Sequence, residues 1–106
     1  MERLKIGFAV IYRWRLRRGM EKQFCAAWAE TTEKIMEERH GLGSRLHRDD
    51  DGYWVAYAQW PSRQAWEQSR ELGPADPRLS ALMADAVEES LAPVELEPVM
   101  DMLVFA

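Results

Sequence analysis

Apolar and polar positions alternate along the first part of the chain, which is the period of a β-strand. Between Ile6 and Leu16, the large apolar and aromatic side chains fall on one face of such a strand. The other face starts with small apolar residues and ends with Arg13 and Arg15, so both faces are partly apolar. Strands of that kind are usually covered on both sides. The pattern therefore predicts a first strand over 6–16 whose large face carries the main core.

The apolar period lengthens to three and four residues after Met20, which predicts a helix over 20–39. Phe24, Trp28 and Ile35 fall on its apolar stripe, and acidic residues occupy much of the remaining surface. Gly41 is suited to the end of this helix, because glycine readily adopts the left-handed conformation that stops one.

Two shorter apolar runs follow and are separated by an Asp-Gly pair. The pair favours a hairpin, so the runs over 42–48 and 53–60 are predicted to form antiparallel strands. Ser62 comes directly after the second run and is a suitable N-cap for a short helix.

The last third of the chain returns first to a helical period and then to alternation. A helix is predicted over 77–91, with apolar residues up to Leu91 on its inward face. A last strand is predicted over 94–105. Met100 and Met102 share one face of this strand and are expected to fill the core at the helix layer.

The predicted order is strand, helix, strand, strand, helix, strand. This is the ferredoxin-like βαββαβ arrangement, an α+β fold in which a four-stranded antiparallel sheet carries both helices on one face. It is predicted as one domain over 1–106. The other sheet face would carry Ile11 and, depending on register, Val99, Leu103 and Phe105. An uncovered apolar face marks a partner surface, so we expect a homodimer through the sheet face.

Composition narrows the class of protein. The 106 residues are 47% hydrophobic with a net charge of -4, which argues against disorder. Cations cluster only near Arg13 to Arg18, so nucleic acid is not an expected partner. No apolar run approaches the roughly 20 residues of a membrane helix, and no signal-peptide pattern is present, so a cytoplasmic protein is expected. Cys25 is the single cysteine, and His40 and His47 fall on different elements, so neither a disulfide framework nor a metal site is predicted.

Two segments, 10–24 and 54–66, resemble the antibiotic biosynthesis monooxygenase domain family. The first has a strand, a basic residue and a glycine, and then an acidic amphipathic helix with Phe24 in its first turn. The second has a strand that ends in Trp60, a capping Ser62 and an aromatic at Trp66. The resemblance implies a dimeric α+β barrel with a pocket between sheet and helices. It also implies oxidation of an aromatic or quinol compound by O₂ without a cofactor.

A haem-degrading branch of the same family uses an Asn on the first strand, a Trp on the helix after the third strand, and a later His. Tyr12 stands at the Asn position, Trp66 matches the Trp, and Asp76 falls near the His position. Because iron needs an axial ligand such as His, the sequence argues against this route, and no cofactor is predicted. Haem ligation by Tyr12 and binding of a flavin stay open.

Oxidation without a cofactor needs a group that stabilises a substrate anion and a pocket that excludes water. Tyr12, Trp66 and the possible base His47 are the candidate catalytic residues. Arg13, Arg45 and Arg63 are cations that could offset an oxyanion. The candidate substrate pocket comprises Phe8, Trp14, Trp28, Tyr57, Trp60 and Arg63.

Each candidate also has a plain structural interpretation. Trp28 and Trp60 fit an ordinary core, Tyr12 fits a core tyrosine with a satisfied hydroxyl, and His47 fits a surface or interface position. The sequence therefore leaves open whether the chain is an enzyme. The alternatives are a cofactor-independent monooxygenase and a non-catalytic dimeric module that binds a small ligand or serves a stress response. An interaction protein that uses the basic edge at 13–18 is a third.

Overall fold

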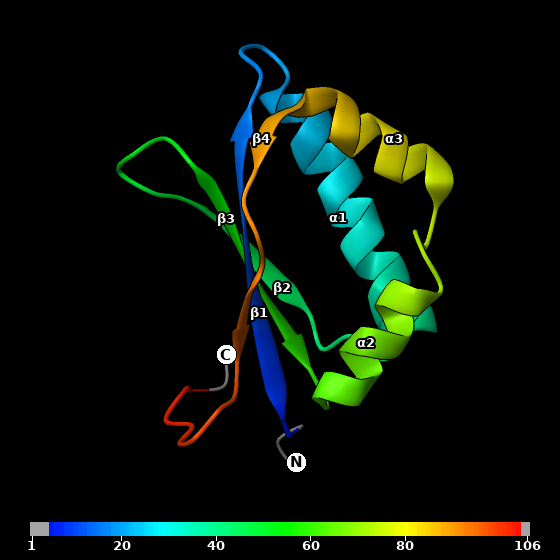
Figure 1. The fold of residues 1–106 in the computed structure, drawn as a ribbon, viewed down its shortest axis with the longest axis vertical. Coiled ribbons are helices and arrows are strands. Elements are labelled where there is room, and N and C mark those ends of the chain that lie inside the picture. Colours follow the sequence, from blue (N-terminus) through cyan, green and yellow to red (C-terminus); the bar gives the residue numbers. More distant parts are fainter. Residues whose placement is uncertain (1–4, 105–106) are drawn as a thin grey trace.

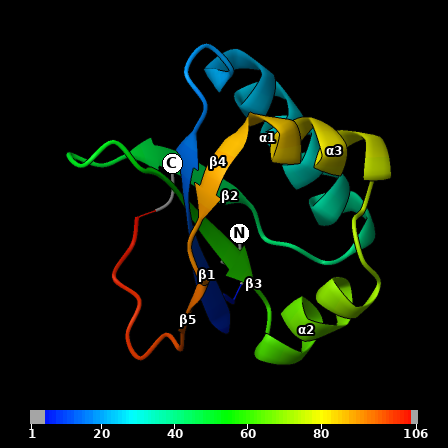
Figure 2. The ribbon, with the colours of Figure 1, turned by 45° about the horizontal axis from the view of Figure 1, so that its top comes forward.

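A computed structural model describes residues 5–104 and shows helices packed on one face of an antiparallel sheet (Figures 1 and 2). The predicted ferredoxin-like α+β fold is confirmed. In chain order, the elements are β1 (Phe8–Leu16), α1 (Glu21–Glu38), β2 (Ser44–Arg48), β3 (Trp54–Trp60), α2 (Arg63–Glu71), α3 (Pro77–Ala86), β4 (Val87–Ser90) and β5 (Val94–Leu96).

The sheet has the order β2-β3-β1-β4, and β5 also pairs with β1, so β1 lies at its centre. Every pairing is antiparallel. In the register of β1 with β3, Tyr12 lies opposite Ala56 and Val10 lies opposite Ala58. Small alanines beside large side chains leave space on the helix-covered face of the sheet, and a cavity occupies that space.

The core forms on the predicted face of β1. Phe8 and Val10 are almost completely buried and cluster with Trp60 from β3 and Trp66 from α2. Tyr12, Ile35 and Ala65 pack against this cluster. The period-two pattern of the first strand therefore gave the correct inward face.

The end of α1 differs in detail from the prediction. His40, and not Gly41, adopts the left-handed conformation, with a φ of 65°. Gly41 serves a different purpose, because a Cβ at this position would lie 2.6 Å from Cγ2 of Ile35. A close approach of the chain to the helix therefore requires the glycine here.

Both helices after β3 begin at a capping side chain, of which Ser62 was predicted from the sequence. Ser62 caps α2 by accepting a hydrogen bond from the backbone N–H of Ala65 at 3.1 Å. Asp76 caps α3 by accepting from the N–H groups of Arg78 and Leu79. In the part of the chain that the structure describes, no helix is long and apolar enough to cross a membrane.

The C-terminal third contradicts two predictions. The helix expected over 77–91 ends at Ala86, and the chain continues as β4 from Val87. Glu88 and Glu89 follow the β-branched Val87, and Glu89 pairs with Arg15 of β1 at 3.7 Å. Pairing with β1 thus overrides the helical period, and Val87 and Leu91 are not inward helix residues.

The predicted last strand is also shorter than expected, because β5 ends at Leu96. Pro98 lacks a backbone N–H for a ladder, and 97–104 forms no strand. Met100 and Met102 are 81% and 82% exposed, so the expectation that they fill the core is wrong. Val99 is 95% exposed, and Phe105 lies outside the described residues.

Candidate functional site

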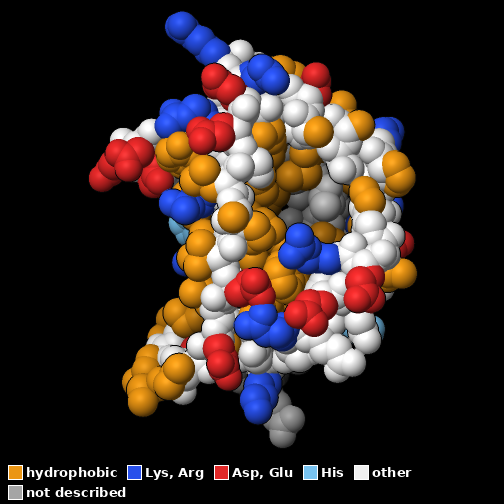
Figure 3. Space-filling model, in the orientation of Figure 1, with side chains coloured by type: hydrophobic (Ala, Val, Ile, Leu, Met, Phe, Trp, Pro, Cys, Tyr) orange, Lys and Arg blue, Asp and Glu red, His pale blue; other side chains and the backbone are white. Residues whose placement is uncertain are grey.

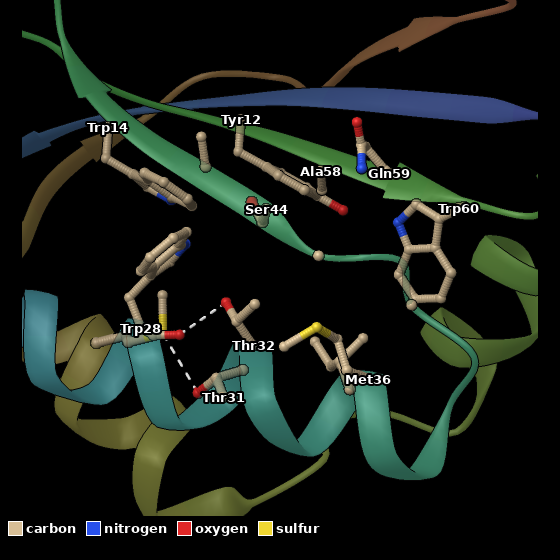
Figure 4. Close-up of a pocket in the computed structure, with 15 residues that line it drawn as sticks. Tyr12, Trp14, Trp28, Thr31, Thr32, Met36, Ser44, Ala58, Gln59 and Trp60 are labelled. Atoms are coloured by element: carbon tan, nitrogen blue, oxygen red, sulfur yellow. Dashed lines mark hydrogen bonds between the residues drawn. The ribbon is translucent and has the colours of Figure 1, made fainter. Parts of the chain in front are cut away.

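A cavity of about 200 Å³ lies between the sheet and α1 (Figure 4). Its walls are largely apolar and aromatic, with side chains from β1, β2 and β3 on one side and from α1 and α3 on the other. The lining residues are Tyr12, Trp14, Trp28, Thr31, Thr32, Ile35, Met36, Gly41, Gly43, Ser44, Ala56, Ala58, Gln59, Trp60 and Met83.

A second cavity of about 420 Å³ adjoins the first and is more polar. Arg39, Arg70 and Asp76 contribute to its wall, together with Trp66 and Ser69 from α2. Figure 3 shows an apolar hollow between the sheet and the helices on this face of the molecule. The residues that line both cavities are Tyr12, Thr31, Ile35, Trp60 and Met83.

Tyr12 and Trp66 form a hydrogen-bonded pair at the boundary of the two cavities. The Trp66 indole N–H donates to the Tyr12 hydroxyl oxygen at 2.7 Å, and Trp66 is only 2% exposed. Since the phenol oxygen accepts this bond, the Tyr12 hydroxyl keeps its own proton for donation. A ligand oxygen beside Tyr12 would be a suitable acceptor.

The protonation state of Tyr12 follows from its surroundings. Burial raises the pKa of Tyr12 above its usual 10.0, whereas the Trp66 hydrogen bond and the charge of Arg70 act in the lowering direction with smaller effect. Tyr12 therefore remains a neutral hydrogen-bond donor at physiological pH and is not a phenolate base.

Neighbouring aromatic rings hold this pair in place. Trp14 stacks on Tyr12 with ring centroids 5.9 Å apart, and Phe24 from α1 meets Trp14 edge-on at 5.0 Å. Phe8 contacts Trp66 at 5.4 Å, and the Arg70 guanidinium lies 4.8 Å from the centre of the Trp66 ring. Side chains from three elements thereby fix the orientation of the Tyr12 hydroxyl.

The sequence of the chain matches the antibiotic biosynthesis monooxygenase family over residues 7–74. This range spans β1, α1, the β2–β3 hairpin and α2, and so contains nearly all of the first cavity. The chain belongs to the antibiotic biosynthesis monooxygenase family. The resemblance seen in segments 10–24 and 54–66 is thereby confirmed.

Solved structures agree with this family and share the fold. The monooxygenase from the gene ActVA-Orf6 of Streptomyces coelicolor, in complex with nanaomycin D, is 23% identical, with a TM-score of 0.72 and 94% of each chain covered. SnoaB, a cofactor-independent oxygenase from Streptomyces nogalater, is 14% identical with a TM-score of 0.70, and the match covers 92% of this chain and 98% of that one. Rv0793 from Mycobacterium tuberculosis is 21% identical with a TM-score of 0.71, covering 91% and 98%. No curated protein matches the chain significantly.

Within this family fold, the structure brings several candidate residues together. Tyr12, Trp14, Trp28 and Trp60 line the first cavity, and Trp66 joins Tyr12 and Trp60 in the second. Phe8 lies in the core beneath Trp66 and lines neither cavity. These residues had been predicted as site candidates from the family resemblance and from the period of the strands.

Other candidates lie elsewhere. Since Tyr12 and Ala56 face the helices, the alternation of β2 and β3 turns His47 and Tyr57 to the opposite face of the sheet. The His47 ring bonds the Val55 carbonyl through Nδ1 at 3.1 Å and accepts from Arg45 through Nε2 at 2.9 Å. The sheet thus separates His47 from both cavities, and its position does not support a role as the base.

The three candidate cations also lie outside the cavities. Arg63 stacks on the Phe8 ring at 4.7 Å and forms an ion pair with Glu95 of β5. Arg13 lies opposite Val55 and Arg45 opposite Tyr57, so both share the helix-free face with His47. None of them lines either cavity, and the cations that do so are Arg39 and Arg70 in the wall of the second cavity.

Several lining residues were not predicted as site residues from the sequence. Thr31, Met36 and Met83 fall on apolar helix faces, but a periodic pattern does not distinguish a core contact from a cavity wall. Ala56 and Ala58 were a usable signal, because two alanines on the inward face of a strand leave room that larger residues would fill. Among residues 5–104, no group of His, Cys, Asp and Glu side chains could hold a metal ion.

Proposed function

We propose that this chain is a cofactor-independent monooxygenase that acts on an aromatic or quinol-type small molecule. The observation that carries the proposal is the Tyr12–Trp66 pair, which presents a neutral hydroxyl donor at the wall of an apolar, aromatic cavity. Family membership supports it, as does the similarity of the fold to SnoaB, a cofactor-independent oxygenase.

The reaction balances without an added reductant. A phenol with a free para position and one O₂ give a quinone and one water, and a hydroquinone with a free ring position and one O₂ give a hydroxyquinone and one water. In both cases the substrate supplies all the electrons that reduce the second oxygen atom. The enzyme must favour the phenolate, since that anion gives up an electron to O₂ more readily than the phenol does. A hydroxyl that donates to the phenolate oxygen in a water-poor site has this effect.

Each residue of the site would contribute one part. Tyr12 donates to the substrate oxygen, and Trp66 fixes the direction of that donation. Trp14 and Trp28 provide flat walls for an aromatic ring, as Figure 4 shows. The apolar lining excludes water, which strengthens the hydrogen bond to a developing anion.

The test is oxygen uptake by metal-free and flavin-free protein with a panel of hydroquinones and anthrone-type phenols. We expect saturable uptake that falls about 100-fold in Tyr12→Phe, which is the usual effect of removing one donor to an anionic intermediate. Tyr53→Phe is the matched control, because the Tyr53 hydroxyl donates to Glu89 and Tyr53 lines neither cavity. Equal uptake by Tyr12→Phe and wild type would contradict the assigned role.

A flat oxygen trace across the whole panel, with the fold intact, would reject the monooxygenase. The cavity would then favour the second candidate, a non-catalytic module that binds a small apolar ligand. Its specific support is the large share of apolar lining, which suits binding as well as catalysis.

We further propose that the protein is a homodimer through the helix-free face of the sheet. Ile11 and Tyr57 lie opposite each other on that face. The neighbouring C-terminal segment exposes large apolar side chains, which Figure 3 shows at the lower left. The most exposed of them are Val99, Val104, Met102 and Met100.

A further inference from the structure

The indole N–H of Trp60 lacks a hydrogen-bond partner, although Trp60 is only 4% exposed. Among residues 5–104 it is the one buried side-chain nitrogen or oxygen atom in this condition. A buried donor without an acceptor is costly, and native proteins seldom retain one without a reason. Because Trp60 lines the cavity walls, an acceptor group of a ligand that packs against its indole can satisfy this donor.

The position of the donor indicates the kind of group. Trp60 lines both cavities, as does Tyr12. In Figure 4, the indole nitrogen of Trp60 and the hydroxyl of Tyr12 point toward each other at the same end of the first cavity. Both are neutral donors, since the Tyr12 oxygen already accepts from Trp66.

The hydroxyl and amide side chains of this cavity, apart from Tyr12, are already engaged. Thr31 and Thr32 donate to backbone carbonyls of α1 at 2.7 and 2.9 Å. Ser44 donates to the Tyr57 carbonyl at 2.9 Å and Gln59 to the Leu42 carbonyl at 3.1 Å. These bonds leave the hydroxyl of Tyr12 and the indole N–H groups of Trp14, Trp28 and Trp60 as donors at this cavity, and the N–H of Trp60 is the fully buried one among them.

We propose that Trp60 and Tyr12 together bind one oxygen atom of the ligand, and that this oxygen is a ring-attached carbonyl or the phenolate that becomes one. Trp60 is then a substrate-binding residue that decides how the aromatic compound is oriented. The proposal rests on the proposed function for the identity of the substrate, and it adds the residue and the functional group that position it.

The test compares two ligands of one skeleton, 1-indanone and indane, which differ by a carbonyl in place of a methylene. Affinities are measured by NMR titration of wild type, Trp60→Phe and Trp28→Phe. We expect Trp60→Phe to weaken 1-indanone about tenfold more than indane. Trp28→Phe removes another indole from the same cavity and should change both affinities by similar factors.

A second measurement needs no variant. In the wild type, 1-indanone should move the Trp60 indole N–H proton signal downfield, and saturating indane should not. An unmoved Trp60 signal under saturating 1-indanone, or equal weakening of both ligands by Trp60→Phe, overturns the proposal. Failure of 1-indanone to bind the wild type also overturns it.

These outcomes are separate from the oxygen-uptake test. If binding prefers 1-indanone over indane and this preference depends on Trp60, but no oxygen is consumed, the donor pair is supported and the oxygenase is rejected. If oxygen is consumed but binding shows no such preference, the oxygenase is supported and the proposed role of Trp60 is rejected.

Discussion

Tyr12 illustrates how several weak constraints position one candidate functional side chain. Its place on β1 gives it the inward face, Ala56 opposite it leaves room for its ring, and Trp14 stacks on that ring. Trp66 then fixes the hydroxyl from a helix that lies 54 residues later in the chain. The result is a donor whose direction and protonation are set by its neighbours.

The raised pKa of Tyr12 predicts a particular response to alkaline pH. The unfolded chain loses the Tyr12 proton near pH 10.0, before the folded protein does, so the folded state binds more protons above that pH. The contribution of Tyr12 to the free energy of unfolding is therefore constant below pH 10 and falls as the pH rises through the folded pKa. Tyrosinate absorbance should show a component that titrates above pH 10 and is absent in Tyr12→Phe. A Tyr12 component that titrates at or below pH 10 would contradict this environment.

At the scale of elements, the corner between β3 and α2 decides where Trp66 lies. Gly7, just before β1, donates its N–H to the Trp60 carbonyl at 3.0 Å. A Cβ on Gly7 would lie 2.1 Å from the Pro61 carbonyl oxygen, so the two segments are as close as backbones allow. Ser62 then caps α2, and one helical turn later Trp66 reaches Tyr12.

Gly7→Ala should therefore open this corner. Since backbone must move to accept the methyl group, we expect the free energy of unfolding to fall by about 2–3 kcal/mol in chemical denaturation. Gly19→Ala is the comparison, because its Cβ would meet nothing within 4 Å and only the positive φ of 88° is penalised, by about 1 kcal/mol. A smaller loss for Gly7→Ala than for Gly19→Ala would show that the corner is not tightly packed.

At the scale of the molecule, the fold divides the sheet into two unequal faces. All three helices of the described chain cover one face, and the two cavities form beneath them (Figures 1 and 2). The opposite face carries Ile11 and Tyr57, and 97–104 lies beside it as a segment without regular structure. Exposing the apolar side chains of this segment to water is unfavourable in free energy. Association with a second copy of the chain would remove them from water.

Light scattering at micromolar concentration should consequently give the mass of a dimer. Ile11→Lys places a charge on the helix-free face and should shift the protein toward the monomer. Ala29→Lys adds the same charge to the exposed side of α1 and should leave the dimer intact. A monomer in the wild type, or equal dissociation by both variants, would contradict the proposed interface.

The sequence indicated most of the fold because local signals agreed with tertiary pairing. The structure confirms the strand predicted from alternation in β1, the helix predicted from the period of α1, and the cap predicted at Ser62. Agreement ended at Val87, where apolar spacing suited a helix but pairing with β1 favoured a strand. The period also gave a strand over 99–104, but no partner strand was available there.

The candidate site, like the fold, could be predicted only in part from the sequence. The sequence alone, through its pattern and its family resemblance, determined an α+β fold and an aromatic inward face, and it predicted Tyr12 and Trp66 as candidate site residues. Only the tertiary structure decided that their side chains meet, that His47 lies across the sheet, and that Trp60 keeps an unpaired N–H. The reason is physical: periodicity fixes the face on which a side chain lies, whereas contacts between residues distant in sequence depend on how the elements pack.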